Sequence, residues 1–318
     1  MEALIRDKYG SVDYLQIREV PTPTPNDDQI LVRVRAASIN DWDWGMLLGG
    51  MNRAFGGLLS PKVILGCDMA GEVESVGKHV GGFKVGDRVY GDLCGSGFGA
   101  FAQYVCVRAK ALRQMATGMS FEQAAAIPQA AVLAQQALFG LRPLSAGQKI
   151  LINGAGGGVG TFGIQLARLH DVEVTGVDSH HKLDMMRSIG FDHVLDYEKV
   201  DFTTTGPYDL IVDAKTTRAP TDYVRALKPN GIYATVGGPR LLKIAFLHWL
   251  YGRRENKTLR LVGLKPNRDL EYFNQLFEQG KFTPIIDGAY RFTESGVRSA
   301  FTHYGTATHL GKVVVSFT

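Results

Sequence analysis

The 318-residue sequence predicts an α/β protein with two domains, a β-rich, barrel-like domain followed by a domain built on a parallel sheet. Three observations predict this fold class. The chain is about twice as long as a usual domain. Its first part consists of short strands separated by glycine-rich turns. In its second part strands alternate with helices, which is the order of βαβ units whose strands run parallel.

The first domain is predicted to span residues 1–120. Apolar and polar residues alternate in Ile30–Ala36, as they do in a strand with one buried face. Glu72–Gly77 and Asp87–Tyr90 are shorter runs with the residue types of strands, and glycines mark the turns around them. Short strands with this density of turns predict a barrel-like β domain.

The second domain is predicted to span residues 121–261. Its strands Lys149–Asn153 and Val172–Val177 lie on either side of a helical stretch, Thr161–His170. A strand, a helix and a second strand in this order make one βαβ unit, and similar alternation continues along the domain.

The last segment, residues 262–318, is predicted to complete the first domain. We expect one further helix in it, Asp269–Gln279, and a closing strand, Lys312–Phe317. The apolar, β-branched composition of the closing strand is typical of a buried position in a sheet.

A glycine-rich turn with the spacing Ala155-x-Gly157-x-x-Gly160 joins the strand at 149–153 to the next helix. Without a side chain, Gly157 lets the backbone approach a pyrophosphate, and Gly160 lets the helix pack close to the strand. The N–H groups at the helix N-terminus then face the phosphates. A glycine motif alone is also typical of a flexible turn. The strand before this one and the helix after it favour a dinucleotide site.

The residues after the next strand bear on the choice between NADH and NADPH. Asp178 lies near the place, about 20 residues beyond the glycines, where an acid bonds both ribose hydroxyls, and this favours NADH. Ser179, His180, His181 and Lys182 follow, and their hydroxyl, imidazoles and ammonium suit a 2′-phosphate. A solvated polar turn would carry the same residues. We predict NADPH, with NADH possible, because four adjacent donors outweigh one carboxylate that can rotate away.

Blocks of sequence along nearly the whole chain carry a family resemblance. In chain order they are Ala36–Asp43, Leu65–Gly77, Phe83–Gly91, Gly99–Tyr104, Ala124–Pro128, the glycine turn, Leu195–Tyr197, Gly280–Asp287 and Gly311–Val315. Together they resemble the medium-chain dehydrogenase/reductase superfamily, in particular its zinc-independent quinone oxidoreductase branch. The resemblance implies a GroES-like β-barrel catalytic domain and a Rossmann cofactor domain with a doubly wound parallel sheet. It also implies an active site in the cleft between them.

The resemblance further implies which residues bind the cofactor. The pyrophosphate would be held by Ala155, Gly156, Gly157, Gly158, Val159 and Gly160. The adenosine phosphate would be surrounded by Ser179, Lys182 and Tyr197, with Asp178 and His181 beside them. The nicotinamide side would be lined by Ala214, Val236 and Gly263, with the backbone at His309 and Leu310 closing over it.

The zinc ligands of metal-dependent members of the superfamily are missing from this sequence. Those members use a Cys, a Gly-His-Glu block and a distant Cys, Asp or Glu, whereas this chain has Gly66–Asp68 as the block and Asn40 near the first position. The three cysteines, Cys67, Cys94 and Cys106, cannot supply a four-cysteine zinc lobe. Cys67 and Asp68 are either a residual metal-binding pair or, for Cys67, a small buried thiol. We favour the buried thiol. We therefore predict no metal site.

Without a metal to polarise a carbonyl, the substrate must already be electron-poor, as quinones and α,β-unsaturated carbonyls are. We predict hydride transfer from the nicotinamide to such an acceptor. The candidate donor to the developing oxyanion is Asn40, although its amide could instead brace a loop or the nicotinamide ribose. Leu133 stands where the branch often has a Thr, so a dinucleotide-binding protein of low turnover, with a structural or interaction role, is the alternative.

Composition excludes several other classes of function. The formal net charge is +4 and no Lys/Arg-rich run occurs, so we predict no nucleic-acid partner. The most apolar stretch, Leu241–Tyr251, contains Lys243 and is too short to span a bilayer, so we predict no stable membrane insertion. Few cysteines and no signal-peptide pattern predict a cytoplasmic protein. A homodimer is possible by analogy with relatives.

Overall fold

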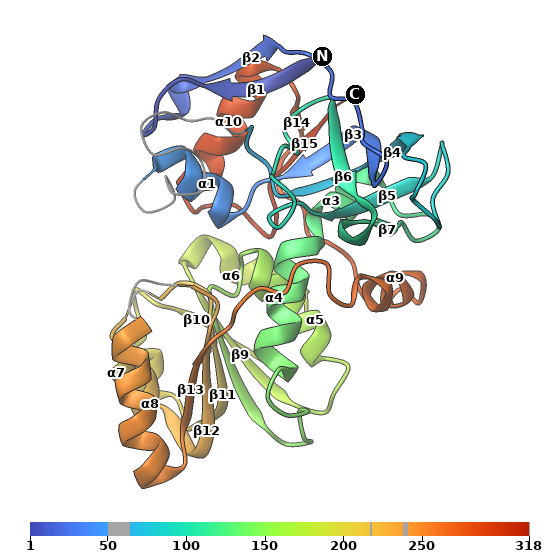
Figure 1. Ribbon diagram of the computed structural model, residues 1–318. Coiled ribbons are helices and arrows are strands. Elements are labelled where there is room, and N and C mark those ends of the chain that lie inside the picture. Colours follow the sequence, from blue (N-terminus) through green and yellow to red (C-terminus); the bar gives the residue numbers. More distant parts are fainter. Residues whose placement is uncertain (50–63, 217, 238–240, 318) are drawn as a thin grey trace. The chain divides into compact units, whose positions relative to one another are not determined.

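The computed structural model describes residues 1–49, 64–216, 218–237 and 241–317. The chain divides into two compact units, Met1–Val132 with Lys265–Thr318, and Leu133–Leu264 (Figure 1). The sequence places the domain boundaries earlier, after residues 120 and 261. The first boundary of the units falls inside helix α4, Pro128–Phe139, so one continuous helix runs from the first unit into the second.

The first unit contains an antiparallel sheet with the strand order β14-β15-β3-β4-β5-β7, in which β6 also pairs with β3. A separate two-stranded sheet pairs β1 with β2. The strands are β1 Glu2–Arg6, β2 Leu15–Glu19, β3 Gln29–Ser38, β4 Asp68–Val76, β5 Arg88–Asp92, β6 Tyr104–Arg108, β7 Arg113–Gln114, β14 Tyr290–Arg291 and β15 Val314–Ser316. The edge strand β14 runs parallel to β15, and the other pairs are antiparallel. The closing strand predicted from the sequence thus returns to the first unit as β15, beside β3.

The register of this sheet lines up polar residues at the ends of three strands. Ser38, the last residue of β3, faces Asp68, the first residue of β4. Asp68 in turn faces Asp92, the last residue of β5, and β15 pairs with the end of β3 on its other side. This alignment positions the polar cluster described below.

Among its described residues, the first unit has four further helices. They are α1 Asp41–Leu48, α3 Phe121–Ala126, α9 Leu270–Glu278 and α10 Glu294–Gly305. The sequence predicts α9 but misses α10, so the expectation of a single helix after residue 262 is wrong. The glycines and β-branched residues of α10 lower its helix propensity, but Val297, Ala300 and Phe301 form a buried face at helical spacing. Phe301 packs against Phe101, with ring centroids 5.5 Å apart.

The second unit is a six-stranded, all-parallel sheet with the order β10-β9-β8-β11-β12-β13. Its strands are β8 Lys149–Asn153, β9 Glu173–Asp178, β10 His193–Asp196, β11 Tyr208–Asp213, β12 Leu227–Thr235 and β13 Thr258–Leu261. Its helices are α5 Gly158–Ala167, α6 Leu183–Ser188, α7 Pro220–Arg225 and α8 Leu241–Glu255. Counted along the chain, this is the order 3-2-1-4-5-6 of the doubly wound dinucleotide fold. The prediction of a Rossmann sheet is confirmed.

In a doubly wound sheet, ligands bind at the carboxyl ends of the strands, where the strand order reverses. Here the reversal lies between β8 and β11. At that point Asn153 donates from Nδ2 to Asp213 Oδ1 at 2.9 Å, so the ends of the two strands are joined by side chains as well as by the sheet. Among the described residues, no helix is long and apolar enough to cross a membrane.

Candidate functional site

The predicted cofactor residues of the second unit all follow the carboxyl ends of its strands. The glycine turn follows β8, Asp178 ends β9 with Ser179 directly after it, and Tyr197 follows β10. On the other side of the reversal, Ala214 follows β11, Val236 follows β12, and Gly263 lies just beyond β13. Parallel strands bring all of these positions to one edge of the sheet. Their individual contacts with a cofactor stay predictions.

The glycine turn has the geometry of a phosphate cradle. Gly154 has a φ of +83°, and the N–H groups of Gly154 and Ala155 donate to the carbonyl of Val177 at 2.9 and 3.1 Å. A Cβ at Gly160 would lie 2.3 Å from the carbonyl oxygen of Ala155, so only glycine allows α5 to approach β8 this closely. A Cβ at Gly157 would meet only the carbonyl oxygen of Gly154, at 3.5 Å. The backbone at Gly157 is therefore uncrowded on the side where a side chain would stand, which is compatible with the close approach of a pyrophosphate.

Asp178 is held beneath the glycine turn. Its Oδ2 accepts the N–H of Gly156 at 2.9 Å, and its Oδ1 accepts the N–H of Ser179 at 2.9 Å. The ammonium of Lys182 lies 3.7 Å from Oδ1, and the Lys182 side chain is fully buried, against Gly156. The carboxylate is thus fixed by two backbone N–H groups, and the nearby ammonium balances its charge inside the protein.

The polar residues around Asp178 differ in their access to solvent. His181 is exposed, Ser179 is half-buried, and the Tyr197 residue is 49% exposed. The backbone N–H of Tyr197 donates to the carbonyl of Asp178 at 3.2 Å, which keeps the ends of β9 and β10 together. Hydroxyl and imidazole groups therefore gather at this corner, while the ammonium of Lys182 faces inward.

The nicotinamide-side residues sit on a rigid base. Asp213, at the end of β11, accepts the hydroxyl of Tyr233 at 2.7 Å and the N–H of Thr216 at 2.9 Å. The backbone N–H of Ala214 donates to the backbone carbonyl of Asn153 at 2.9 Å. The backbone N–H of Val236 donates to the backbone carbonyl of Asp213 at 3.0 Å. Because these bonds fix the backbone after each strand, the lining positions have little freedom to move.

His309 and Leu310 belong to the first unit and are fixed there. The His309 ring stacks on Tyr304 with centroids 4.7 Å apart, and the backbone N–H of Leu310 donates to Asp287 Oδ2 at 2.8 Å. Asp287 also lies 3.4 Å from His303 Nε2. The predicted role of this backbone segment in closing over the nicotinamide is not tested by these contacts.

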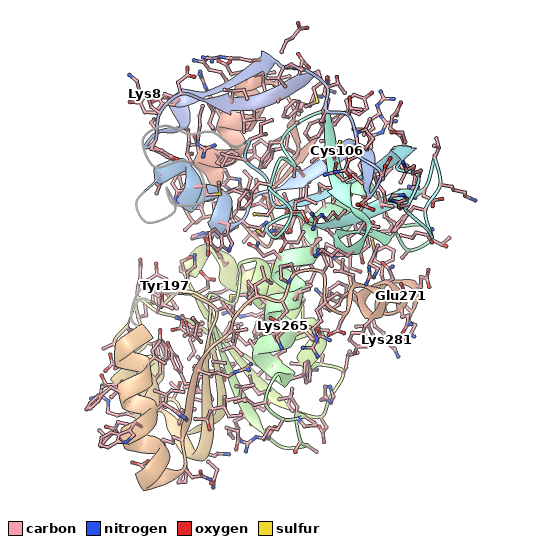
Figure 2. The ribbon with its side chains drawn as sticks, in the orientation of Figure 1. Lys8, Cys106, Tyr197, Lys265, Glu271 and Lys281 are labelled. Carbon is pink, nitrogen blue, oxygen red and sulfur yellow. The ribbon has the colours of Figure 1, made fainter. Side chains whose placement is uncertain are left out.

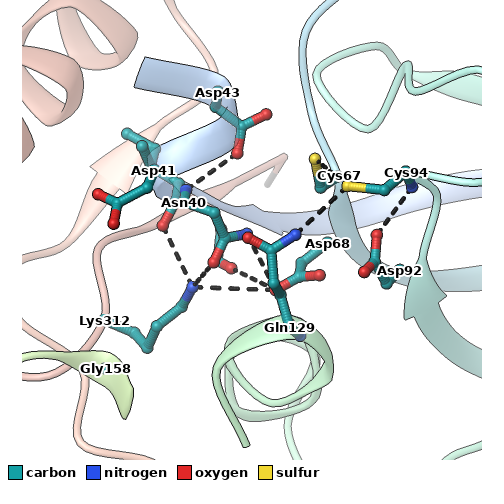
Figure 3. Close-up of polar contacts among 12 residues, drawn as sticks. Asn40, Asp41, Asp43, Cys67, Asp68, Asp92, Cys94, Gln129, Gly158 and Lys312 are labelled. Carbon is teal, nitrogen blue, oxygen red and sulfur yellow. Dashed lines mark hydrogen bonds and ion pairs between the residues drawn. The ribbon is translucent and has the colours of Figure 1, made fainter. Parts of the chain in front are cut away.

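Asn40 lies in a buried polar cluster of the first unit (Figure 3). Its Nδ2 donates to Asp68 Oδ2 at 3.0 Å, and its Oδ1 accepts from the ammonium of Lys312. Lys312 also donates to the carbonyl of Ile39 at 3.1 Å, and its Nζ lies 3.8 Å from Asp68 Oδ2. The backbone N–H of Gln129, near the start of α4, donates to the same oxygen at 3.2 Å. One ammonium, one amide and one carboxylate thus form a connected network.

The electrostatics of this cluster follow from its burial. Burial raises the pKa of Asp68 and lowers the pKa of Lys312, and the attraction between the two opposes both shifts. Lys312 also polarises the amide of Asn40 by bonding its oxygen, which makes the N–H groups of that amide stronger donors. One of these N–H groups is engaged with Asp68, and an amide nitrogen carries two.

Asp43, on α1, anchors the loop that carries Asn40. Its carboxylate accepts the backbone N–H of Asn40 at 2.9 Å and that of Gly66 at 3.0 Å. Burial raises the pKa of Asp43 to about 6, although these two donors work in the opposite direction. The start of α1 and the segment before β4 are therefore held together through one buried carboxyl group.

Two family models match this chain. The model of the alcohol dehydrogenase GroES-like domain matches residues 26–117, and that of the zinc-binding dehydrogenases matches residues 189–315. Over 99% of the chain, the sequence is 31% identical to the 2-methylene-furan-3-one reductase of Solanum lycopersicum, of which it covers 79%. A chloroplastic quinone oxidoreductase of Triphysaria versicolor is 30% identical, with 99% of this chain and 98% of that protein covered.

The chain belongs to the medium-chain dehydrogenase/reductase superfamily. Among solved structures, the quinone oxidoreductase of Coxiella burnetii is 25% identical, has a TM-score of 0.88, and is matched over 100% of this chain and 99% of that chain. The predicted combination of a GroES-like domain with a Rossmann domain is confirmed, and so is the resemblance to the quinone oxidoreductases. This member of the superfamily is an oxidoreductase that uses a nicotinamide dinucleotide.

In this chain, the residues near the zinc position of metal-dependent members do not fit a zinc ion. Asn40 Oδ1 and Asp68 Oδ2, which stand near the expected ligands, both face the ammonium of Lys312. The sulfur of Cys67 points to a different neighbour, the sulfur of Cys94, 2.7 Å away. The oxygens nearest the expected ligand positions thus already face the ammonium of a lysine.

Sequence reasoning missed three residues that the fold brings to these sites. Lys312 is predicted only as the start of a strand, although a lysine next to an apolar run is a signal of a paired, buried charge. Gln129, near the start of α4, contributes its backbone N–H to Asp68. Asp92 is brought beside Asp68 by the register of β5 with β4. For these two residues the sequence offers no local signal, because their partners are distant along the chain.

We predict that Lys312 and Asp68 are strongly coupled. Lys312→Met leaves a buried carboxylate without its cation, and the free energy of unfolding should fall by about 3–5 kcal/mol. Adding Asp68→Asn should restore part of this loss. Denaturant unfolding of both single variants and the double variant measures the coupling, and single-variant losses that simply add within about 0.5 kcal/mol would contradict it. Lys78→Met, at the exposed Lys78–Asp27 pair, is the control and should cost at most about 1 kcal/mol.

We also predict a pH dependence of stability that depends on Asp43. Its pKa in the folded protein, about 6, exceeds the ordinary 3.8, so the folded state holds the proton more tightly. The resulting stabilisation is present at low pH and is lost as the pH rises through about 6. Between about pH 4 and pH 7 the free energy of unfolding of the native protein should fall by up to about 3 kcal/mol. The Asp43→Asn variant should not show this fall. Urea unfolding of both proteins across this range is the measurement, and parallel pH profiles would refute the prediction.

Proposed function

We propose that this oxidoreductase transfers hydride from NADPH to a quinone or an α,β-unsaturated carbonyl compound without using zinc. The observation that carries the proposal is the open cradle before Gly157, in a chain that matches reductases of such acceptors along its length. The NADPH-dependent alkenal/one oxidoreductase of Arabidopsis thaliana, for example, is 30% identical in sequence. The match covers 99% of this chain and 79% of that protein.

The polar cluster of the first unit supports an acceptor that is already electron-poor. Where metal-dependent relatives have a Lewis acid, this chain has the ammonium of Lys312 bonded to Asn40. A hydrogen bond from an amide stabilises a developing oxyanion less than a metal ion does. Quinones and enones need less help, because their own conjugation spreads the charge that arrives with the hydride. Asn40 is the proposed donor, through the amide N–H that Asp68 leaves free.

The surroundings of Asp178 support NADPH over NADH. Both oxygens of Asp178 accept bonds from backbone N–H groups, and Lys182 offsets its charge. Such a carboxylate is poorly placed to bond the ribose hydroxyls of NADH and repels a 2′-phosphate only weakly. Ser179 and His181 then provide donors at the surface for that phosphate.

The other expectations stay predictions. They are the absence of a catalytic zinc, a cytoplasmic location, a homodimer, and the absence of membrane and nucleic-acid partners. The low-turnover alternative rests on Leu133, in the part of α4 that belongs to the second unit, because leucine cannot donate the hydrogen bond of the Thr often found there. Turnover distinguishes this alternative from the proposed enzyme.

The test is a turnover assay that follows oxidation of the reduced cofactor. Purified protein is mixed with NADPH or NADH and a panel of quinones, 2-alkenals and simple ketones. We expect turnover on quinones or alkenals, a clear preference for NADPH, and no loss of rate after incubation with a zinc chelator. Binding of NADPH without turnover on any acceptor would favour the alternative. A chelator-sensitive rate that zinc restores would refute the zinc-independent mechanism.

Gly157→Val tests where the phosphates bind. The added side chain has room in the protein but would fill the cradle, so NADPH affinity should fall at least about a hundredfold, or about 3 kcal/mol. Its thermal unfolding should stay close to that of the native protein. Gly160→Ala is the matched comparison, because its Cβ clashes with the backbone of Ala155 and should lower stability instead. Titration of cofactor fluorescence and thermal unfolding separate the two effects; unchanged NADPH affinity in Gly157→Val would place the phosphates elsewhere.

A further inference from the structure

Two cysteines and an aspartate converge in the first unit, next to the polar cluster (Figure 3). One possible ligand atom from each of Cys67, Asp92 and Cys94 lies within 4.8 Å of the other two. Among the described residues, no other group of three or more His, Cys, Asp or Glu side chains is close enough to share a metal ion. The side chains also come from two separate parts of the chain, which the pairing of β4 with β5 brings together.

The backbone fixes this convergence. The N–H of Leu93 donates to the carbonyl of Cys67 at 2.7 Å and so holds the two segments side by side. The N–H of Cys94 donates to Asp92 Oδ1 at 2.7 Å, which orients the carboxylate. The two sulfurs lie 2.7 Å apart, closer than the roughly 3.5–4 Å of ordinary contacts between heavy atoms.

The second oxygen of Asp92 is the observation that points to a ligand. Asp92 is only 1% exposed, and its Oδ2 makes no hydrogen bond. A buried carboxylate oxygen without a partner is costly unless it binds a cation. The side chains nearest to it in the cluster are thiols, and thiolates with a carboxylate are a donor set that zinc accepts.

A neighbouring amide supports the same chemistry. Gln129 Nε2 donates to the sulfur of Cys94 at 3.3 Å. Hydrogen bonds of this kind orient metal-bound ligands and stabilise the negative charge that a thiolate carries. A disulfide would need neither this donor nor the unpartnered oxygen of Asp92.

We propose that Cys67, Cys94 and Asp92 bind one thiophilic divalent cation of the zinc class. Binding releases one proton from each thiol and joins two thiolates and one carboxylate to the ion. Sulfurs on one tetrahedral zinc lie about 3.8 Å apart, since each Zn–S bond is about 2.3 Å, so the pair opens by about 1 Å on binding. Cys94 is half-buried, which leaves a side from which the ion and a water as fourth ligand can enter.

This ligand set differs from the zinc site of the metal-dependent relatives. It uses Cys67 from the Gly66–Asp68 block, but its other ligands come from the end of β5 and the residues after it. Asn40 and Lys312, on which the proposed reaction rests, take no part in this ligand set. The inference is therefore independent of the proposed reaction.

The experiment measures metal binding by the full chain, kept reduced and freed of metal by a chelator. Cd²⁺ is added as the probe, and the ultraviolet band from thiolate-to-metal charge transfer is followed. Zn²⁺ is then added to displace it, and native mass spectrometry counts the ions. We expect one ion per chain, complete loss of the band in Cys94→Ser, and at least about tenfold weaker binding in Asp92→Asn. Cys106→Ser is the matched control and should bind as the native protein does.

Two results would overturn the proposal. One is the absence of a bound ion in the reduced native chain, with far-ultraviolet circular dichroism showing that it is folded. The other is Cd²⁺ binding that survives in both Cys94→Ser and Asp92→Asn, which would place the ion elsewhere. A native chain that is isolated two hydrogens lighter, and that binds no ion after reduction, would assign the two sulfurs to a disulfide instead.

Discussion

The buried interaction of Lys312 with Asn40 and Asp68 is the constraint on which the first unit depends. The lysine precedes β15, the amide follows β3, and the carboxylate begins β4. One charge network therefore joins three segments that the sequence separates widely. Replacing a buried ion pair with apolar residues can be neutral, but removing one partner leaves a charge in a poorly solvating interior. The network therefore holds the closing segment of the chain to the first sheet.

The same network supports the zinc-independent chemistry that we propose. In metal-dependent relatives a metal ion can polarise an unactivated carbonyl or alcohol. An ammonium bonded to an amide instead offers hydrogen bonds, which suit an acceptor that is electron-poor from the start. The thiol cluster at Cys67 and Cys94 is built from other residues than the amide network, although Gln129 contacts both, through its backbone N–H to Asp68 and its side chain to Cys94. Figure 2 shows the side chains of the described residues in both units.

The cofactor site rests on a different physical requirement, the close approach of backbone to backbone. Gly160 is needed because a single Cβ would collide with Ala155, and Gly157 because a side chain there would fill the cradle. Asp178 contributes by receiving the N–H of Gly156, so the acid after β9 shapes the turn after β8. Residues usually assigned to cofactor choice thus also build the cradle that binds the phosphates.

The sequence by itself determined the two-domain organisation, the alternation of strands and helices in the cofactor domain and the glycine turn. These features are local or periodic, so spacing along the chain expresses them directly. The tertiary structure alone decided that Lys182 is buried under the turn, that Lys312 bonds Asn40 beside Asp68, and that Asp92 and Cys94 meet Cys67. Strand pairing between distant segments sets those contacts, and no local pattern encodes a register. Helix α10 was missed for a related reason, because its stability comes from the packing of Phe301 and not from its own propensity.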